Sequence, residues 1–178
     1  MPIDAWHFAD AYTLDRARLN KGFFQSVSAK LPGELNCWTI SSKHFADAQY
    51  GANGMLFKVF NSHANRIEIF ELIRKEVAPT APSRNDCFFA FASRADAVVA
   101  QSSWQSFGGL RLEQVQIQDD ANVFLGDADL YTNAGTAGLW VRDAAYRFWL
   151  GRRSANPKME YLVGGTVYFP NWESFPAV

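Results

Sequence analysis

The sequence has few of the residues from which metal and disulfide sites are built. Its 178 residues include two cysteines, Cys37 and Cys87, and three histidines, His7, His44 and His63. None of the histidines lies three or four positions from another histidine or from a cysteine, the spacing common in zinc sites. We therefore expect neither a zinc site nor a disulfide scaffold, and Cys87, in an apolar run, is expected to behave as a small hydrophobe.

Long apolar runs and an excess of charge are also missing. No segment approaches the roughly 18 apolar residues of a membrane span, and the N-terminus lacks the basic and apolar segments of a signal peptide. The formal net charge of −1 gives no broad attraction to nucleic acid or to an anionic membrane. We expect a cytoplasmic protein with no membrane partner, and delivery into a target or host cell by a route without a cleaved signal stays open.

Three common catalytic motifs are absent from the sequence. No Gly-x-Gly-x-x-Gly follows a predicted strand, and neither a Gly-x-x-x-x-Gly-Lys loop nor a Gly-x-Ser-x-Gly elbow occurs. These absences argue against a doubly wound dinucleotide fold, a nucleoside triphosphatase and an acyl-transfer hydrolase.

Aromatic residues, by contrast, are abundant. Hydrophobic residues make up 48% of the chain, with six tryptophans and fifteen phenylalanines. This composition is typical of a globular protein, and the length predicts one domain over residues 1–178. Some of the rings must fill the core, and others are available to stack on a planar ligand.

Apolar periodicity and turn residues predict a mixed α+β domain. Strands are expected at residues 5–9, 87–91 and 110–117 and as two short pieces of 160–169 hinged at Gly164-Gly165, and helices at about 62–77, 93–104 and 140–148. Residues 119–126 are expected to form a turn, residues 127–131 a short element, and residues 20–54 mostly loop, as in many lids and binding loops.

The segment 71–91 is the most informative part of the chain, because an amphipathic helix ends there at a proline-rich turn before an apolar strand. Ser83 and Arg84 follow Pro82 and place a hydroxyl and a guanidinium at the strand entrance. Such groups on a rigid turn can hold a ligand phosphate or ribose. An ordinary turn with a solvated arginine fits the same pattern.

His7 in the first strand and Glu160 at the start of a late strand are the other candidate site residues. Taken alone, a strand histidine is more often a core residue, and a strand-initial glutamate is more often a surface charge.

Several short motifs nevertheless occur together in one order along most of the chain. They are Trp6-His7-Phe8, Arg74 and Glu76 before Pro79, Pro82-Ser83-Arg84 with Phe88-Phe89 after it, the helix at Trp104, the segment 146–151, and Glu160-Tyr-Leu-Val-Gly-Gly-Thr-Val167. With these motifs the chain resembles a bacterial family that looks like a divergent branch of the ADP-ribosyltransferase superfamily.

The resemblance implies an ADP-ribosyltransferase-like α+β fold, in which a split pair of small antiparallel sheets with flanking helices holds NAD in the cleft. It implies that Glu160 is the catalytic residue, that His7 bonds a ribose hydroxyl of the adenosine half, and that Ser83 occupies the middle-strand hydroxyl position. It further implies that Arg84 pairs with the pyrophosphate. Phe88, Phe89 and Tyr146 are the candidates to flank the nicotinamide.

The implied reaction cleaves the nicotinamide–ribose bond of NAD and transfers ADP-ribose to a macromolecular acceptor, with the Glu160 carboxylate stabilising an oxocarbenium-like state. Bacterial members of such folds are often toxins, effectors or phage-related modifiers. The sequence departs from the family pattern at Ser83, which no Ser-x-Ser pattern follows, and at Lys158, which stands where arginine-modifying members carry an acidic residue. Arginine is therefore a less favoured acceptor.

Three alternatives stay open at this point. They are an NAD glycohydrolase, a non-catalytic protein- or nucleotide-binding module on the same fold, and a structural domain in which His7 and Glu160 never meet. The acceptor and the oligomeric state are not readable from the sequence.

Overall fold

The computed structural model describes residues 1–26, 66–136 and 138–177. Its strands are β1 Ile3–Ala9, β2 Phe23–Gln25, β3 Phe88–Phe91, β4 Arg111–Ile117, β5 Asn122–Asp127, β6 Met159–Gly164 and β7 Thr166–Tyr168. Its α-helices are α1 Ala11–Leu19, α3 Arg66–Val77, α4 Arg94–Ser103, α5 Ala128–Thr132 and α6 Val141–Trp149, with short 3₁₀ turns at Gln105–Phe107 and Trp172–Ser174. The predicted mixed α+β class is confirmed.

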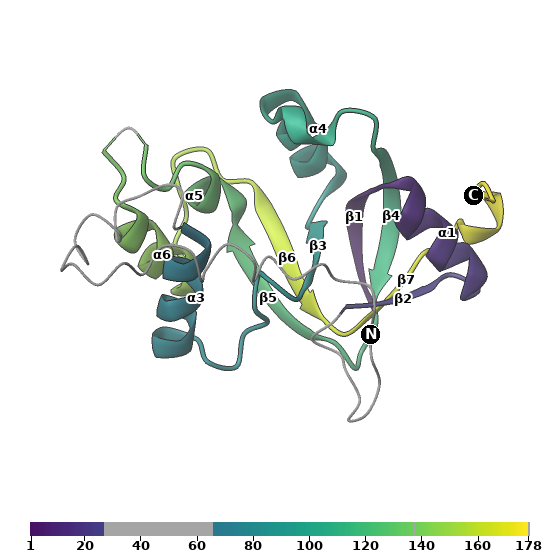
Figure 1. Cartoon of the computed structure of the whole chain (residues 1–178), viewed down its shortest axis with the longest axis horizontal. Coiled ribbons are helices and arrows are strands. Elements are labelled where there is room, and N and C mark those ends of the chain that lie inside the picture. Colours follow the sequence, from purple (N-terminus) through teal and green to yellow (C-terminus); the bar gives the residue numbers. More distant parts are fainter. Residues whose placement is uncertain (27–65, 137, 178) are drawn as a thin grey trace, which may run out of the picture.

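The seven strands form one antiparallel sheet in the order β2-β7-β4-β1-β3-β6-β5. The sheet is weakly joined in its middle. β1 pairs with β4 from Ile3 to Ala9, whereas Trp6 with Phe91 is the single register pair between β1 and β3 in the described chain. The two groups β2-β7-β4-β1 and β3-β6-β5 therefore meet at a split (Figure 1).

The chain crosses from one group to the other at Gly164-Gly165, the predicted hinge between two short strands. β6 belongs to one group and β7 to the other. Gly165 is required there, because a Cβ atom on it would lie 2.5 Å from the Ala121 Cα atom. The predicted pair of strands is confirmed, and the close approach to Ala121 explains the glycine at position 165.

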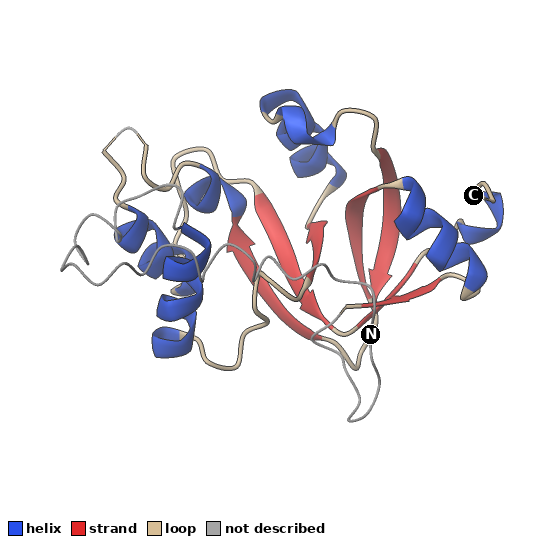
Figure 2. Ribbon diagram, viewed as in Figure 1, coloured by secondary structure: helices blue, strands red, loops and turns tan. Residues whose placement is uncertain are grey.

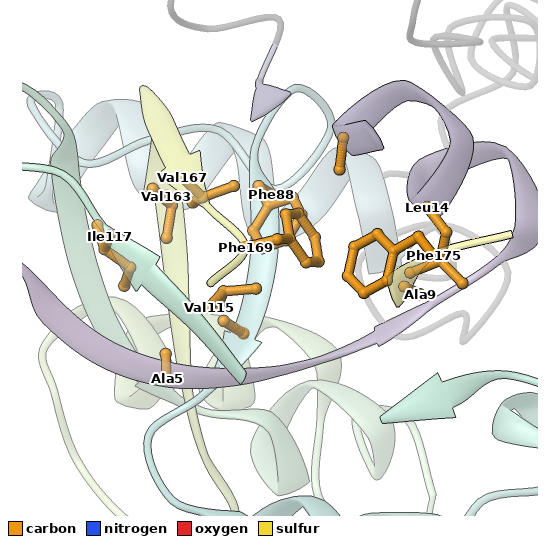
Figure 3. Close-up of a cluster of buried hydrophobic side chains, with 12 residues drawn as sticks. Ala5, Ala9, Leu14, Phe88, Val115, Ile117, Val163, Val167, Phe169 and Phe175 are labelled. Carbon is orange, nitrogen blue, oxygen red and sulfur yellow. The ribbon is translucent and has the colours of Figure 1, made fainter. Parts of the chain in front are cut away.

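Helices cover the two groups separately (Figures 1 and 2). α3, α5 and α6 lie beyond β5 and β6 at one end of the molecule, α1 lies beside the other group, and α4 lies between them. The described residues form three apolar cores. One spans the two strand groups and joins Phe88 to Phe169, Phe175 and Leu14 (Figure 3). A second joins Phe70 to Phe148, Trp149 and Leu162, and a third joins Phe8 and Phe91 to Ala97 and Ala100 of α4.

Several predicted elements are confirmed with small shifts of their ends. The described part of the helix expected at 62–77 begins at Arg66, and the helix expected at 93–104 is α4, in which Ser93 caps Asp96. The strand at 110–117 is β4, the helix at 140–148 is α6, and the short element at 127–131 is α5.

Two predictions about local structure were wrong or incomplete. Residues 119–126 are not simply a turn, because β5 begins at Asn122 and pairs along its whole length with β6. Helix α1 was missed because only Leu14 and Ala17 of it are buried, so its sequence carries almost no apolar periodicity. Asp10 nevertheless marks its start, since its carboxylate accepts the Thr13 N–H at 2.7 Å.

The prediction of a long loop at 20–54 falls mostly on residues that lie outside the described ones. Within its described part, Phe23–Gln25 forms strand β2, which pairs with β7. In the described part of the chain, no helix has the length and apolarity needed to cross a bilayer.

Candidate functional site

The strands that carry the predicted site residues are neighbours in the sheet. His7 lies on β1, Phe88 and Phe89 lie on β3, and Glu160 lies on β6, and these strands are consecutive at the split. The sequence separates His7 from Glu160 by most of the chain, so only the tertiary structure brings their strands together.

The His7 side chain bridges the split. Its Nδ1 atom lies 2.6 Å from the backbone oxygen of Phe89, and its ring lies 4.1 Å from the Phe88 ring, centroid to centroid. A side-chain hydrogen bond therefore satisfies a carbonyl close to the point where the backbone pairing between β1 and β3 stops.

His7 is neutral at physiological pH. Burial lowers the pKa of the imidazole to about 4, although the hydrogen bond to Phe89 and the charge of Asp10 act in the opposite direction. Because the Phe89 carbonyl can only accept, Nδ1 carries the ring proton and Nε2 keeps its lone pair. His7 thus offers an acceptor, which suits a ligand hydroxyl or amide N–H.

A pocket of about 170 Å³ opens beside His7. Its lining residues come from β1, α1, β2 and β3 and the residues next to them: they are His7, Thr13, Phe24, Gln25, Ser26, Cys87, Phe88 and Phe89. An apolar cavity of about 150 Å³ is large enough for benzene, so this pocket has the size of one planar ring rather than of a dinucleotide.

Phe24 forms a wall of this pocket that the sequence analysis did not anticipate. Its ring lies 5.7 Å from the Phe88 ring, although β2 and β3 stand four places apart in the strand order. The sheet must therefore curve strongly to bring its edge strand back over β3. No local pattern in the sequence signals this contact.

Arg84 and Glu160 form a buried ion pair next to this region. The Arg84 Nη1 atom donates to the Glu160 Oε1 atom, and the exposed fractions of the two side chains are 12% and 7%. Burial lowers the pKa of Arg84, but the neighbouring Glu160 carboxylate raises it, and the resulting pKa lies above the usual value for arginine. Each side chain is thus the ion-pair partner of the other in this structure.

Aromatic rings enclose the Arg84 guanidinium. Its central carbon lies 3.9 Å from the ring centroid of Tyr131, 4.9 Å from that of Phe89 and 5.1 Å from that of Phe148. Such cation–π contacts favour arginine, whose flat guanidinium stacks on a ring. Tyr131 is a second residue that the sequence analysis missed, because α5 is only five residues long.

Ser83 serves the turn that carries Arg84. Its hydroxyl donates to the Glu71 carboxylate at 2.9 Å and accepts the Asn85 N–H at 3.2 Å. Arg74 binds the same carboxylate through two nitrogens and also donates to the backbone oxygen of Ala81. Ser83 therefore stabilises the turn through its hydrogen bonds and does not line the pocket.

His7 and Glu160 lie on opposite faces of the sheet. Trp6 pairs with Phe91 and Phe91 pairs with Glu160, so the side chains of these three residues share one face. His7 follows Trp6 and therefore points to the other face, with Phe88. Accordingly, no carboxylate is among the described residues that line the pocket.

Cys87 connects the pocket with the ion pair. It lines the pocket, and the charges of Arg84 and Glu160 both act on its thiol. Burial raises the pKa of this thiol well above its usual range, so Cys87 lines the pocket as a neutral side chain and is not a nucleophile. This agrees with its predicted behaviour as a small hydrophobe.

A carboxylate does lie on the His7 face, at Glu113. Glu113 is the register partner of His7 on β4, is buried, and forms an ion pair with Arg111. Burial raises the pKa of its carboxyl group despite Arg111. The alternation of β4 contained the signal, because Glu113 occupies an inward position in line with Val115.

Tyr146 is not brought to the pocket. It lies on α6, and its hydroxyl donates to the Glu76 carboxylate at 2.7 Å, in an exposed position. Within the described residues no group of three or more histidine, cysteine and acidic side chains is arranged to hold a metal ion.

Fold and site together define an α+β protein whose antiparallel sheet is split beside a ring-sized pocket. The chain belongs to the family described as "Protein of unknown function (DUF2441)", whose model matches residues 6–171. No curated protein matches the sequence.

Proposed function

We propose that this protein binds NAD at the split and is an ADP-ribosyltransferase. It cleaves the bond between nicotinamide and ribose and transfers ADP-ribose to a macromolecular acceptor. The observation that carries this proposal is the adjacency of β1, β3 and β6, which puts the strands of His7 and Glu160 on either side of one short strand at the split.

The pocket supports the binding of one ring of NAD. It has the volume of one ring and is lined by Phe24, Phe88 and the neutral imidazole of His7. The ring systems of NAD are flat and carry an exocyclic N–H, which suits aromatic walls and an acceptor. The rest of the dinucleotide is too large for this pocket and would extend out of it.

Glu160 is the residue proposed to act on the ribose, from the face of the sheet opposite to the pocket. As the C–N bond breaks, its electron pair leaves with nicotinamide, and the positive charge that develops on the ribose is stabilised by a carboxylate. The acceptor nucleophile then bonds to the same ribose carbon and releases its proton. With water as the acceptor, the same step would be NAD hydrolysis.

The test is incubation of the protein with NAD, alone and with bacterial lysate, following nicotinamide release and labelled ADP-ribose on macromolecules. Transfer of label that Glu160→Gln abolishes and Glu173→Gln preserves would support the proposal, since Glu173 is an exposed carboxylate near the C-terminus. Release of nicotinamide without label would instead indicate a glycohydrolase. If neither is found, the transferase proposal is wrong.

A second candidate function is supported by the state of Glu160. Its carboxylate is bound to Arg84, buried, and on the face away from His7, which suits a protein that binds a nucleotide without cleaving it. In that case Glu160→Gln would keep the affinity for NAD, wild-type protein would release no nicotinamide, and His7→Ala would still weaken binding.

A further inference from the structure

We infer that Arg84 is a positioning residue for the Glu160 carboxylate and not a ligand of the NAD pyrophosphate. This inference rests on the proposed function, because it assigns a role within the same site. It differs from the expectation of the sequence resemblance, in which Arg84 pairs with the pyrophosphate.

The surroundings of Arg84 leave it little freedom to reach a ligand. The rings of Tyr131, Phe89 and Phe148 lie within 5.1 Å of the guanidinium carbon, and 12% of the side chain is exposed. An arginine that captures a phosphate needs several N–H groups open to the ligand. Here the guanidinium is enclosed and already binds a carboxylate.

The contact with Glu160 involves one carboxylate oxygen. Arg84 donates to Oε1. This contact anchors one oxygen and thereby restricts the orientation of the carboxylate, whose side chain is 7% exposed. Arg84 also places a positive charge beside this buried carboxylate.

Tyr131 holds the guanidinium in place for this task. Its ring centroid lies 3.9 Å from the guanidinium carbon of Arg84 and 4.6 Å from that of Arg66, so the ring contacts two guanidinium groups. The Arg66 side chain is itself anchored on the Thr132 carbonyl at 3.3 Å. Arg84, which binds Glu160, is thus held by Tyr131 of α5, and Tyr131 in turn contacts Arg66 at the start of α3.

The test compares the kinetics of NAD cleavage and the affinity for NAD in wild type, Arg84→Lys and Arg84→Met. Arg94→Met is the matched control, because Arg94 is an exposed arginine that lies 5.8 Å from the Trp6 ring. We expect Arg84→Met to lower kcat about 100-fold, with the dissociation constant of NAD changed by less than about threefold, since misplacing a reacting group costs rate rather than binding.

The two roles of Arg84 give different results with lysine. Lysine keeps the charge beside Glu160 but cannot stack on Tyr131, so a positioning role predicts partial recovery of kcat with unchanged affinity. If instead the dissociation constant of NAD rises strongly in both variants while kcat is kept, Arg84 binds the pyrophosphate and our inference is overturned.

A measurement without turnover separates this inference from the proposed function. Chemical unfolding of Arg84→Met, Glu160→Gln and the double variant should show non-additive effects, equal to about tenfold or more in the unfolding constant. Additive effects would overturn the inference, even in an active enzyme. If the wild type does not cleave NAD, the proposed function fails, and so does the role of Arg84 in catalysis. The non-additivity of the unfolding effects would still show whether Arg84 and Glu160 stabilise each other.

Discussion

The His7 imidazole is hydrogen-bonded through Nδ1 to the backbone oxygen of Phe89 at 2.6 Å, across the split between β1 and β3. A single register pair, Trp6 with Phe91, joins these strands in the described chain. One side chain thus joins the two strands and also lines a ring-sized pocket. His7 therefore has a structural role, and the proposed binding of NAD involves the same residue.

The neutral state of His7 predicts how stability depends on pH. The pKa of His7 is about 4 in the folded protein, against 6.5 for an unperturbed histidine, so between these values the unfolded chain binds more protons. Stability should therefore fall as pH decreases from 6.5 to about 4, and His7 should contribute no further loss below that. The partial exposure of His7 limits the contribution to no more than about 3 kcal/mol.

This contribution can be isolated with His7→Gln, whose amide can still donate to the Phe89 oxygen but does not titrate in this range. Urea unfolding of both proteins at pH 7, 6, 5 and 4 should give curves that converge towards low pH. If the two free energies of unfolding stay parallel over this range, the neutral assignment of His7 is wrong.

Replacement of Glu160 should separate charge from packing. Glu160→Ala leaves Arg84 buried without its partner, so we expect a loss of about 3–5 kcal/mol in the free energy of unfolding. Glu160→Gln keeps a hydrogen-bond acceptor and should lose about 1–3 kcal/mol. Glutamine is therefore the better variant for activity assays. An equal loss in both would show that the negative charge, which both variants remove, carries the whole contribution of Glu160 to stability.

Ser83→Ala should affect the turn and not the affinity for NAD. The variant removes the hydrogen bonds to Glu71 and from Asn85, which should cost about 1–2 kcal/mol of stability. Thermal unfolding and calorimetric titration with NAD measure the two effects. A tenfold or larger loss of affinity for NAD with unchanged stability would show that Ser83 contacts the ligand.

Asp127 should be the most sensitive polar residue outside the site. Its buried carboxylate accepts the N–H groups of Asp129, Ser154 and Lys158, which ties the segment before β6 to the end of β5. Asp127→Ala leaves three backbone donors, one of them in a buried hydrogen bond, without this acceptor and should cost about 3 kcal/mol or more.

Asp127→Asn serves as the intermediate variant, because its amide keeps one accepting oxygen, and it should lose less stability than alanine. Asp119→Ala is the control, since it removes an exposed ion pair with the N-terminus and no buried partner. Similar losses for Asp127→Ala and Asp119→Ala would contradict the assigned role of Asp127.

The sequence predicts most of the local structure around the site because the relevant signals are local. Ser93 with Asp96 marks the start of α4, the alternation at 110–117 marks β4, and two adjacent glycines mark the crossing from β6 to β7. Local sequence patterns do not predict a strand when its pairing with a strand distant in the sequence decides its structure. Burial does not alternate along β5, so this strand is not recognised without its partner β6.

The candidate site follows the same rule. The sequence by itself determined which side chains are available and on which elements His7, Arg84 and Glu160 lie, because helices, turns and strands are specified by nearby residues. Only the tertiary structure decided that Arg84 binds Glu160, that Phe24 joins Phe88, and that His7 and Glu160 face opposite sides of the sheet. The physical reason is that strand register and sheet curvature arise from contacts between residues distant in the chain, and a register shift of one residue reverses the face of every side chain on a strand.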